Sequence, residues 1–203
     1  EFGPVLLSKI LELNEYVKLL ILPLRNSLQY IKAIKETRKD PLTSTGNRLG
    51  LIEDLNYHFN LSARYNSPLS VLFLDIDYFK KINDQYGHIV GDKILINFAS
   101  ILKNLVRKSD MVYRFGGEEF VILLPGTNLD GARQIAANIV RSVSALNIPH
   151  PNSRTSKKIT VSIGIAAMIP TMGCSYERLI HFADHALYAA KQNGRNKFSV
   201  HQD

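Results

Sequence analysis

Two pairs of carboxylates are the residues of this sequence best suited to hold a metal ion. Asp75 and Asp77 close an apolar run and lie two residues apart, so they share one face of the expected strand. Glu118 and Glu119 are adjacent and follow a pair of glycines. Carboxylate oxygens are the ligands that Mg²⁺ prefers, and protein-bound Mg²⁺ often also contacts substrate phosphates. If the two strands are neighbours, the pairs predict a polyphosphate site. Strand-end side chains exposed to water are the alternative for the two aspartates.

The glycine pair, Gly116 and Gly117, separates the short apolar runs 111–113 and 120–124. A tight turn between antiparallel strands requires positive φ, and glycine reaches it without a Cβ clash. The pattern therefore predicts a β-hairpin whose turn is followed directly by the two glutamates. The bare backbone of the glycines would also allow a ligand to approach closely.

The elements around this hairpin alternate between helix and strand. Apolar periodicity and turn residues predict helices at 47–66, 78–85, 89–107, 129–146 and 175–192, and strands at 69–77, 159–166 and 198–200. The middle pair of strands is antiparallel, whereas the other strands are joined through helices. We therefore expect an α/β fold, a mixed central sheet with helices packed on it in the manner of a ferredoxin-like α+β sandwich.

Residues 1–39 are expected to form a helical stalk ahead of a globular domain at 40–203. Pro23 interrupts the helical pattern and predicts a kink or break. Packing of the stalk on its own domain and pairing with a second copy or an upstream domain are both open. Because the chain starts Glu-Phe-Gly without Met, we expect a fragment that lacks an upstream sensory domain. The stalk carries apolar residues four and three apart, which is typical of a seam against a second helix: Leu6, Ile10, Leu13, Val17, Leu20, Leu24, Leu28 and Ile31.

Composition argues against several classes of protein. Cys174 is the only cysteine, which excludes an internal disulfide and fits a reducing, cytoplasmic location. No run reaches the ~20 apolar residues of a transmembrane helix, although membrane anchoring of a longer protein stays open. The net charge of +7 is spread along the chain and not gathered in one patch, so we expect no nucleic-acid partner.

Basic residues that could bind phosphate are Lys80, Lys191 and Arg195. The last two lie four apart and would reach the same side if the final helix continued to Arg195. Arg107 and Asp110, in the polar link before the hairpin, form an R-x-x-D pattern suited to gripping a guanine edge and a phosphate. For each of these residues alone, a solvated side chain or a surface ion pair is the ordinary alternative.

Four segments, in this order along the chain, carry a family resemblance: DPLTSTGNR, FLDIDYFKKINDQYGHIVGD, RFGGEEF and KQNGRN. In order and spacing they resemble the GGDEF domain of diguanylate cyclases, and the resemblance covers residues 40–201. It implies a fold of the nucleotidyl-cyclase type, in agreement with the expected mixed sheet.

The resemblance implies roles for the acidic residues. Glu119 would help to activate the attacking 3′-hydroxyl, and Lys191 would act with the acids as a catalytic residue. Asp77 also fits the motif, but we expect it to be structural. The ligands of Mg²⁺, or of Mn²⁺ in its place, would be Asp75, Glu118, Glu119 and the backbone carbonyl of Ile76.

The resemblance also implies a GTP site. Asn83 and Asp92 would read the guanine edge, and Gly116 and Gly117 would lie against the guanosine. The turn of Tyr78, Phe79 and Lys80 would wrap the β- and γ-phosphates, and Lys191 and Arg195 would clamp the distal phosphates.

The implied reaction joins two GTP molecules into cyclic di-GMP with loss of two pyrophosphates. Each 3′-hydroxyl attacks the α-phosphate of the other nucleotide. One domain binds one GTP, so a homodimer is needed, and the stalk would set how often the half-sites meet. Arg107 and Asp110 stand at the position before the glycine pair where family members bind cyclic di-GMP as an inhibitor.

Two departures and two alternatives accompany this interpretation. Ser44 and Thr45 replace the Gly and Leu of the usual linking motif, which puts that local turn in doubt. Glu118 in place of Asp is an accepted active variant.

An inactive GGDEF domain that only binds GTP or cyclic di-GMP is one alternative. A related nucleotidyl cyclase or polymerase with another substrate is the second, although Asn83 and Asp92 favour guanine.

Overall fold

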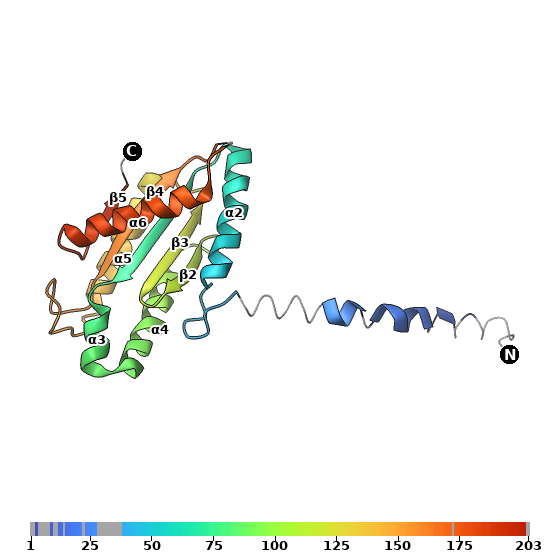
Figure 1. Cartoon of the computed structure of the whole chain (residues 1–203), viewed down its shortest axis with the longest axis horizontal. Helices are drawn as coiled ribbons and strands as arrows, with labels where there is room; N and C mark the ends of the chain where they lie inside the picture. Colours follow the sequence, from blue (N-terminus) through green and yellow to red (C-terminus); the bar gives the residue numbers. More distant parts are fainter. Residues whose placement is uncertain are drawn as a thin grey trace. The chain divides into compact units, whose positions relative to one another are not determined.

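The computed structural model describes residues 3, 9, 12–13, 15–21, 23–27, 38–171 and 173–201. The chain divides into two compact units, Glu1–Arg38 and Lys39–Asp203. Figure 1 draws both units. No helix among the described residues is both long and apolar enough to cross a membrane.

Helical backbone occurs in the first unit at residues 15–21 and 23–27. Four predicted seam residues lie among the described ones and expose 44% to 70% of their surface: Leu13, Val17, Leu20 and Leu24. The other predicted seam residues fall outside the described residues: Leu6, Ile10, Leu28 and Ile31. The kink predicted at Pro23 depends on residue 22, which is also outside them.

The second unit is built on a five-stranded sheet in the order β2-β3-β1-β4-β5 (Figure 1). Its strands are β1 (Leu69–Ile76), β2 (Met111–Gly116), β3 (Glu119–Pro125), β4 (Val161–Met168) and β5 (Phe198–Val200). Every neighbouring pair is antiparallel except β4 and β5, which run parallel. The predicted mixed sheet is therefore confirmed.

Helices cover both faces of the sheet, and this explains why central strand β1 is buried at every residue. One face packs against α2 (Arg48–Tyr65) and α6 (Tyr176–Gln192). The other face packs against α3 (Phe79–Tyr86), α4 (His88–Leu105) and α5 (Leu129–Ala145). Because side chains alternate along a strand, Asp75 shares the α2–α6 face with Phe73.

The strand predicted at 159–166 is shifted toward its C-terminus, since β4 spans Val161–Met168. Its predicted start makes other bonds: Ile159 N donates to Ile148 O at 2.9 Å, and the Thr160 hydroxyl donates to Asp77. The other predicted elements begin and end within two residues of the observed ones, except that β2 continues three residues beyond the predicted run 111–113.

Candidate functional site

The two acidic motifs meet at one end of the sheet. Asp75 is the cross-strand partner of Glu119 in the antiparallel pairing of β1 with β3. Both side chains therefore lie on the α2–α6 face, as directly opposed residues of such a pair do. Glu118 directly precedes Glu119 and lies in the turn between β2 and β3. The strands that carry the two acidic pairs are therefore neighbours, which was the condition for a shared site.

The turn itself differs from the predicted one. Gly116 belongs to β2 and pairs with Glu119, so the two turn residues are Gly117 and Glu118. Only Gly117 has a positive φ, +46°, whereas a type I′ turn requires positive φ at both central residues. The glutamates do not both follow the turn: Glu118 is part of it, and Glu119 begins β3.

Lys191 of α6 reaches the acidic residues, because its Nζ lies 2.8 Å from Oδ2 of Asp75. Burial raises the pKa of Asp75 to about 6 despite this ammonium, and the charges of Glu118 and Asp77 add to the rise. Burial likewise raises the pKa of Glu119, a rise that Lys191 opposes. Each carboxylate therefore lies in surroundings that favour its protonated form.

Within the described residues, no three His, Cys, Asp or Glu side chains converge closely enough to form a metal centre. Asp75 instead contacts the ammonium of Lys191. The donor set still fits Mg²⁺, since Asp75 and Glu119 are adjacent across the sheet and Glu118 raises the pKa of both. A divalent cation would offset this repulsion. The four predicted ligands, Ile76 among them, stay predictions.

Asp77 has a structural role, as expected, although its charge contributes to the raised pKa of Asp75. It is 1% exposed, and its carboxylate accepts hydrogen bonds from the hydroxyls of Thr160 and Ser162, both at 2.7 Å. The backbone N–H of Asn196 is a third donor at 3.1 Å. Asp77 thus ties the end of β1 to β4 and to the turn that follows α6.

The turn at Tyr78 carries a left-handed backbone, with φ of +57° at Tyr78 itself. The Tyr78 ring lies against two cations: the Arg195 guanidinium is 4.6 Å from its centroid and Lys81 Nζ is 4.8 Å away. Phe79 is 4% exposed and packs in the core, so only its backbone is available to a ligand. Lys80 is exposed.

Helix α6 ends at Gln192, so Arg195 does not lie on its continuation. The chain turns instead, with positive φ at residues 194–196. Arg195 nevertheless stays beside Lys191, because its guanidinium donates to the Lys191 carbonyl at 3.2 Å while it covers the Tyr78 ring. The two predicted phosphate-binding cations thus lie beside Asp75 and Tyr78, by a route different from the one the spacing suggested.

Asn83, predicted to read the guanine edge, has a buried Oδ1 with no hydrogen-bond partner among the described residues. A Cβ at Gly91 would lie 2.0 Å from this oxygen, so only glycine leaves room for it. Asp92 follows Gly91 and is exposed. An unpaired acceptor of this kind is suited to a donor on a ligand, such as the N–H groups of guanine.

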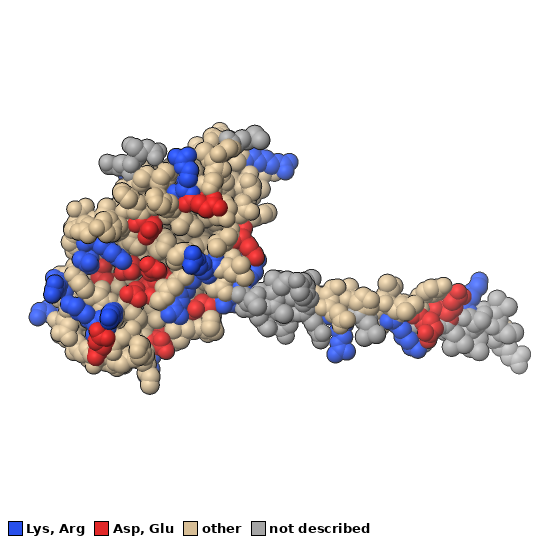
Figure 2. Space-filling model, in the orientation of Figure 1, with Lys and Arg blue, Asp and Glu red and all other residues tan. Residues whose placement is uncertain are grey.

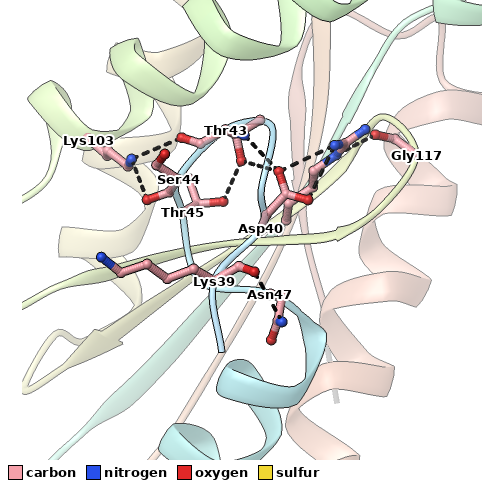
Figure 3. Close-up of polar contacts among 9 residues, drawn as sticks. Lys39, Asp40, Thr43, Ser44, Thr45, Asn47, Lys103 and Gly117 are labelled. Atoms are coloured by element: carbon pink, nitrogen blue, oxygen red, sulfur yellow. Dashed lines mark hydrogen bonds and ion pairs between the residues drawn. The ribbon is translucent and has the colours of Figure 1, made fainter. Parts of the chain in front are cut away.

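Two residues without a predicted role, Asp40 and Arg114, stabilise the hairpin. Asp40 and Gly117 are labelled in Figure 3. Arg114 Nε donates to the carbonyl of Gly117 at 2.9 Å, and Nη1 of Arg114 lies 3.3 Å from both carboxylate oxygens of Asp40. The first residues of the domain are thereby linked to the turn that carries Glu118. Both residues stand in the resembling segments, but 74 positions separate them and neither segment indicates the pairing.

The turn at 40–48, which the departures put in doubt, is well ordered by hydrogen bonds (Figure 3). Asp40 Oδ1 accepts from the N–H and the hydroxyl of Thr43, at 2.8 and 2.7 Å. The Thr43 and Thr45 hydroxyls lie 2.8 Å apart, and Lys103 Nζ donates to the carbonyls of Thr43 and Ser44. Ser44, at the usual glycine position, keeps a left-handed φ of +54°.

The R-x-x-D segment forms a compact turn in which Asp110 is 8% exposed. Its carboxylate accepts the backbone N–H of Arg107 at 2.9 Å and the hydroxyl of Ser109 at 3.3 Å. The Arg107 side chain is exposed, and Arg107 and Asp110 both line a cavity of about 210 Å³ beside α5.

Basic and acidic side chains are interspersed over the face of the molecule drawn in Figure 2. Reds and blues alternate across the described part of that face without a continuous basic stripe.

Residues 37–197 match the family model described as diguanylate cyclase, GGDEF domain. This match covers well over half of the chain, which therefore belongs to the GGDEF family of diguanylate cyclases. The predicted family and its nucleotidyl-cyclase-type fold are confirmed.

Several curated proteins are similar in sequence. Response regulator PleD of Caulobacter vibrioides is 39% identical over 173 residues, which are 85% of this chain and 37% of PleD. Diguanylate cyclase DgcS of Shewanella oneidensis is 34% identical over 197 residues, 97% of this chain and 64% of DgcS. This chain thus spans less than two thirds of the length of either protein.

Solved structures are similar as well. The coiled coil and GGDEF domain of DgcB from Caulobacter crescentus, in complex with c-di-GMP, has a TM-score of 0.77 at 27% identity, covering 96% of this chain and 98% of that one. The active GGEEF domain of a diguanylate cyclase from Vibrio cholerae has a TM-score of 0.69 at 32% identity, covering 77% and 97%.

Proposed function

We propose that this domain condenses two GTP molecules into cyclic di-GMP and two pyrophosphates. The observation that carries the proposal is the meeting of Asp75, Glu119 and Lys191 at one end of the sheet. Arg195 and Tyr78 lie beside them, so acids and phosphate-binding cations occupy one region. Family membership supports the same reaction.

In the proposed complex the guanine lies against Asn83 and Asp92. The buried Oδ1 of Asn83, which has no partner among the described residues, would accept a hydrogen bond from the purine edge. Adenine presents a different pattern of donors and acceptors, so the same pocket should prefer GTP to ATP.

The triphosphate would follow the Tyr78–Lys80 turn toward Lys191 and Arg195. Lys191 contacts Asp75 here, so we propose that it exchanges this carboxylate for a phosphate oxygen when GTP binds. Arg195 is held by the Lys191 carbonyl and the Tyr78 ring, and it would contact the same phosphates.

Asp75, Glu118, Glu119 and the carbonyl of Ile76 would hold Mg²⁺ or Mn²⁺, and the bound ion supplies neutralisation of phosphate charge during the displacement. Glu119 is the proposed acceptor of the 3′-hydroxyl proton. Burial raises its pKa, which makes it a stronger base than a fully solvated glutamate.

Two further parts of the proposal concern assembly and control. One domain presents one nucleotide site, so two copies must face each other, and we propose that the exposed stalk seam at Leu13, Val17, Leu20 and Leu24 pairs them. Arg107 and Asp110 would bind the product and inhibit turnover. The DgcB relative, which includes a coiled coil and bound c-di-GMP, supports both parts by analogy.

The test is incubation with GTP and Mg²⁺ while pyrophosphate and cyclic di-GMP are measured at a series of protein concentrations. We expect both products, a rate that rises with the square of protein concentration at low concentration, and no product from ATP. Glu119→Gln is the matched inactive control. Binding of cyclic di-GMP without release of pyrophosphate would instead identify a receptor.

A further inference from the structure

His150 is a buried histidine outside the predicted site. It lies in the loop between α5 and β4 and is 0% exposed. The loop closes around it, because His150 N donates to the Lys157 carbonyl at 2.8 Å and the His150 carbonyl accepts from Ser153 N at 3.0 Å. The backbone of His150 is therefore fixed within the loop.

The imidazole contacts the Tyr78–Lys80 turn, since its Nε2 lies 3.3 Å from the backbone carbonyl of Tyr78. A carbonyl can only accept, so this contact requires the tautomer with hydrogen on Nε2. Nδ1 is buried and has no partner among the described residues, and burial lowers the pKa of His150. The ring is thus a neutral, single donor.

Tyr78 is a residue whose backbone needs such support. Its left-handed φ of +57° costs on the order of 1–2 kcal/mol for a residue with a side chain, and its side chain does not cap α3. Besides His150, the Tyr78 carbonyl accepts the N–H of Lys81 at 3.0 Å. Two donors from different segments therefore fix the direction of this carbonyl.

The direction of the carbonyl sets the direction of the next N–H group. In a trans peptide the carbonyl of one residue and the N–H of the next point to opposite sides. Anchoring the Tyr78 carbonyl therefore aims the N–H of Phe79 out of the start of α3, where uncapped N–H groups attract anions.

The same loop also contacts α3 further along. The Asn152 carbonyl accepts Lys81 Nζ at 3.0 Å, and the Asn152 amide donates to Gln85 at 2.7 Å. These contacts join the loop to the body of the helix, whereas His150 reaches the residue that precedes it. His150 is thus the loop side chain that contacts the Tyr78–Lys80 turn.

We propose that His150 is a positioning residue that donates Nε2–H to the Tyr78 carbonyl and so holds the Tyr78–Lys80 turn ready for the β- and γ-phosphates. The inference rests on the proposed function for the identity of the nucleotide. It does not require turnover, and it can be tested by binding alone.

The experiment compares two ligands in the presence of Mg²⁺: the α,β-methylene analogue of GTP, which keeps all three phosphates, and GMP, which lacks the two that the turn would hold. His150→Phe keeps a ring and removes the donor. We expect its affinity for the analogue to fall about three- to tenfold, the effect of one lost hydrogen bond, with GMP unchanged. His150→Gln restores a donor and should recover most of the affinity.

Ser153→Ala is the control, because it disturbs hydrogen bonds within the same loop and leaves the contact with Tyr78 in place. It should bind both ligands as the wild type does. If His150→Phe does not fold, His150→Met carries the same prediction. An equal loss for both ligands, or no loss for the analogue, overturns the proposal. If the binding results are as expected but the wild type releases no pyrophosphate from GTP, only the proposed cyclase function is overturned.

Discussion

The ammonium of Lys191 lies 2.8 Å from the Asp75 carboxylate and joins a predicted phosphate ligand to a predicted metal ligand. The two groups come from α6 and from the end of β1, and they are 116 positions apart in the sequence. The contact neutralises a buried carboxylate whose pKa is about 6, above the ordinary 3.8. The expected responses of the protein to pH and to Mg²⁺ both depend on this pair.

The raised pKa of Asp75 predicts a pH-dependent stability. The folded state binds this proton more tightly than the unfolded state, so the contribution of Asp75 to stability is full below about pH 4 and is lost as pH rises through about 6. The shift corresponds to about 3 kcal/mol. Urea unfolding from pH 4 to 7 should show Asp75→Asn gaining stability relative to the wild type. A difference between the two proteins that is independent of pH would contradict the shift.

Mg²⁺ should stabilise the protein by occupying the acidic site. At a concentration ten times the dissociation constant, a ligand that binds only the folded state contributes about 1.4 kcal/mol. We expect millimolar Mg²⁺ to raise the Tm of the wild type at pH 7.5, and Asp75→Asn to lose that rise. Asp84→Asn removes a carboxylate exposed on α3, away from the cluster, and serves as the control. Equal rises in all three proteins would indicate nonspecific binding.

The elements were predictable because their apolar periods are regular. Strand β1 reads as one continuous apolar run since helices cover both of its faces. The proximity of Asp75 and Glu119 follows from the pairing of their strands. The turn was harder to place: a Gly-Gly pair indicates a tight turn, but the bulge between Arg114 and Gly116 moves its centre to Gly117 and Glu118.

Contacts between distant segments could not be predicted from residue types. Asp40 and Arg114 are 74 residues apart, and a single charge in each segment fits a solvated surface equally well. Arg195 reaches Lys191 through a left-handed turn and not along a helix. The spacing therefore predicted that the two residues are neighbours, but through a helical continuation that does not exist. His150 had no sequence signal at all, because its partner is a backbone carbonyl.

Arg114→Lys should separate the hairpin from the start of the domain. Lysine keeps the charge but cannot contact the Asp40 carboxylate and the Gly117 carbonyl with a planar fork. We expect a loss of about 1.5–3 kcal/mol in unfolding free energy, the range for hydrogen bonds to charged groups. GTP turnover should also fall, because Glu118 lies in the released turn. Arg133→Lys, on the exposed face of α5, is the matched control and should change neither quantity.

Ser44→Gly should stabilise the domain. Serine adopts φ of +54° at a position where glycine would have no Cβ clash. Relief of this strain, reduced by the greater entropy of glycine in the unfolded chain, should contribute about 0.5–1 kcal/mol. Thermal unfolding measures it, and Ser44→Val should change the Tm in the opposite direction. A Tm lowered by the glycine would show that the hydrogen bonds of the turn depend on the serine.

Arg107→Ala tests whether product binding at the R-x-x-D turn controls turnover. The exposed guanidinium borders a cavity of about 210 Å³, whereas Asp110 closes the turn through the Arg107 backbone. Removal of the side chain should therefore leave the fold and the initial rate unchanged. We expect the concentration of cyclic di-GMP that halves the rate to rise at least about tenfold, the effect of losing a charge-assisted contact. Lys108→Ala removes the neighbouring exposed cation, and cyclic di-GMP should inhibit this variant as it inhibits the wild type. Unaltered inhibition of Arg107→Ala would place the product elsewhere on the domain.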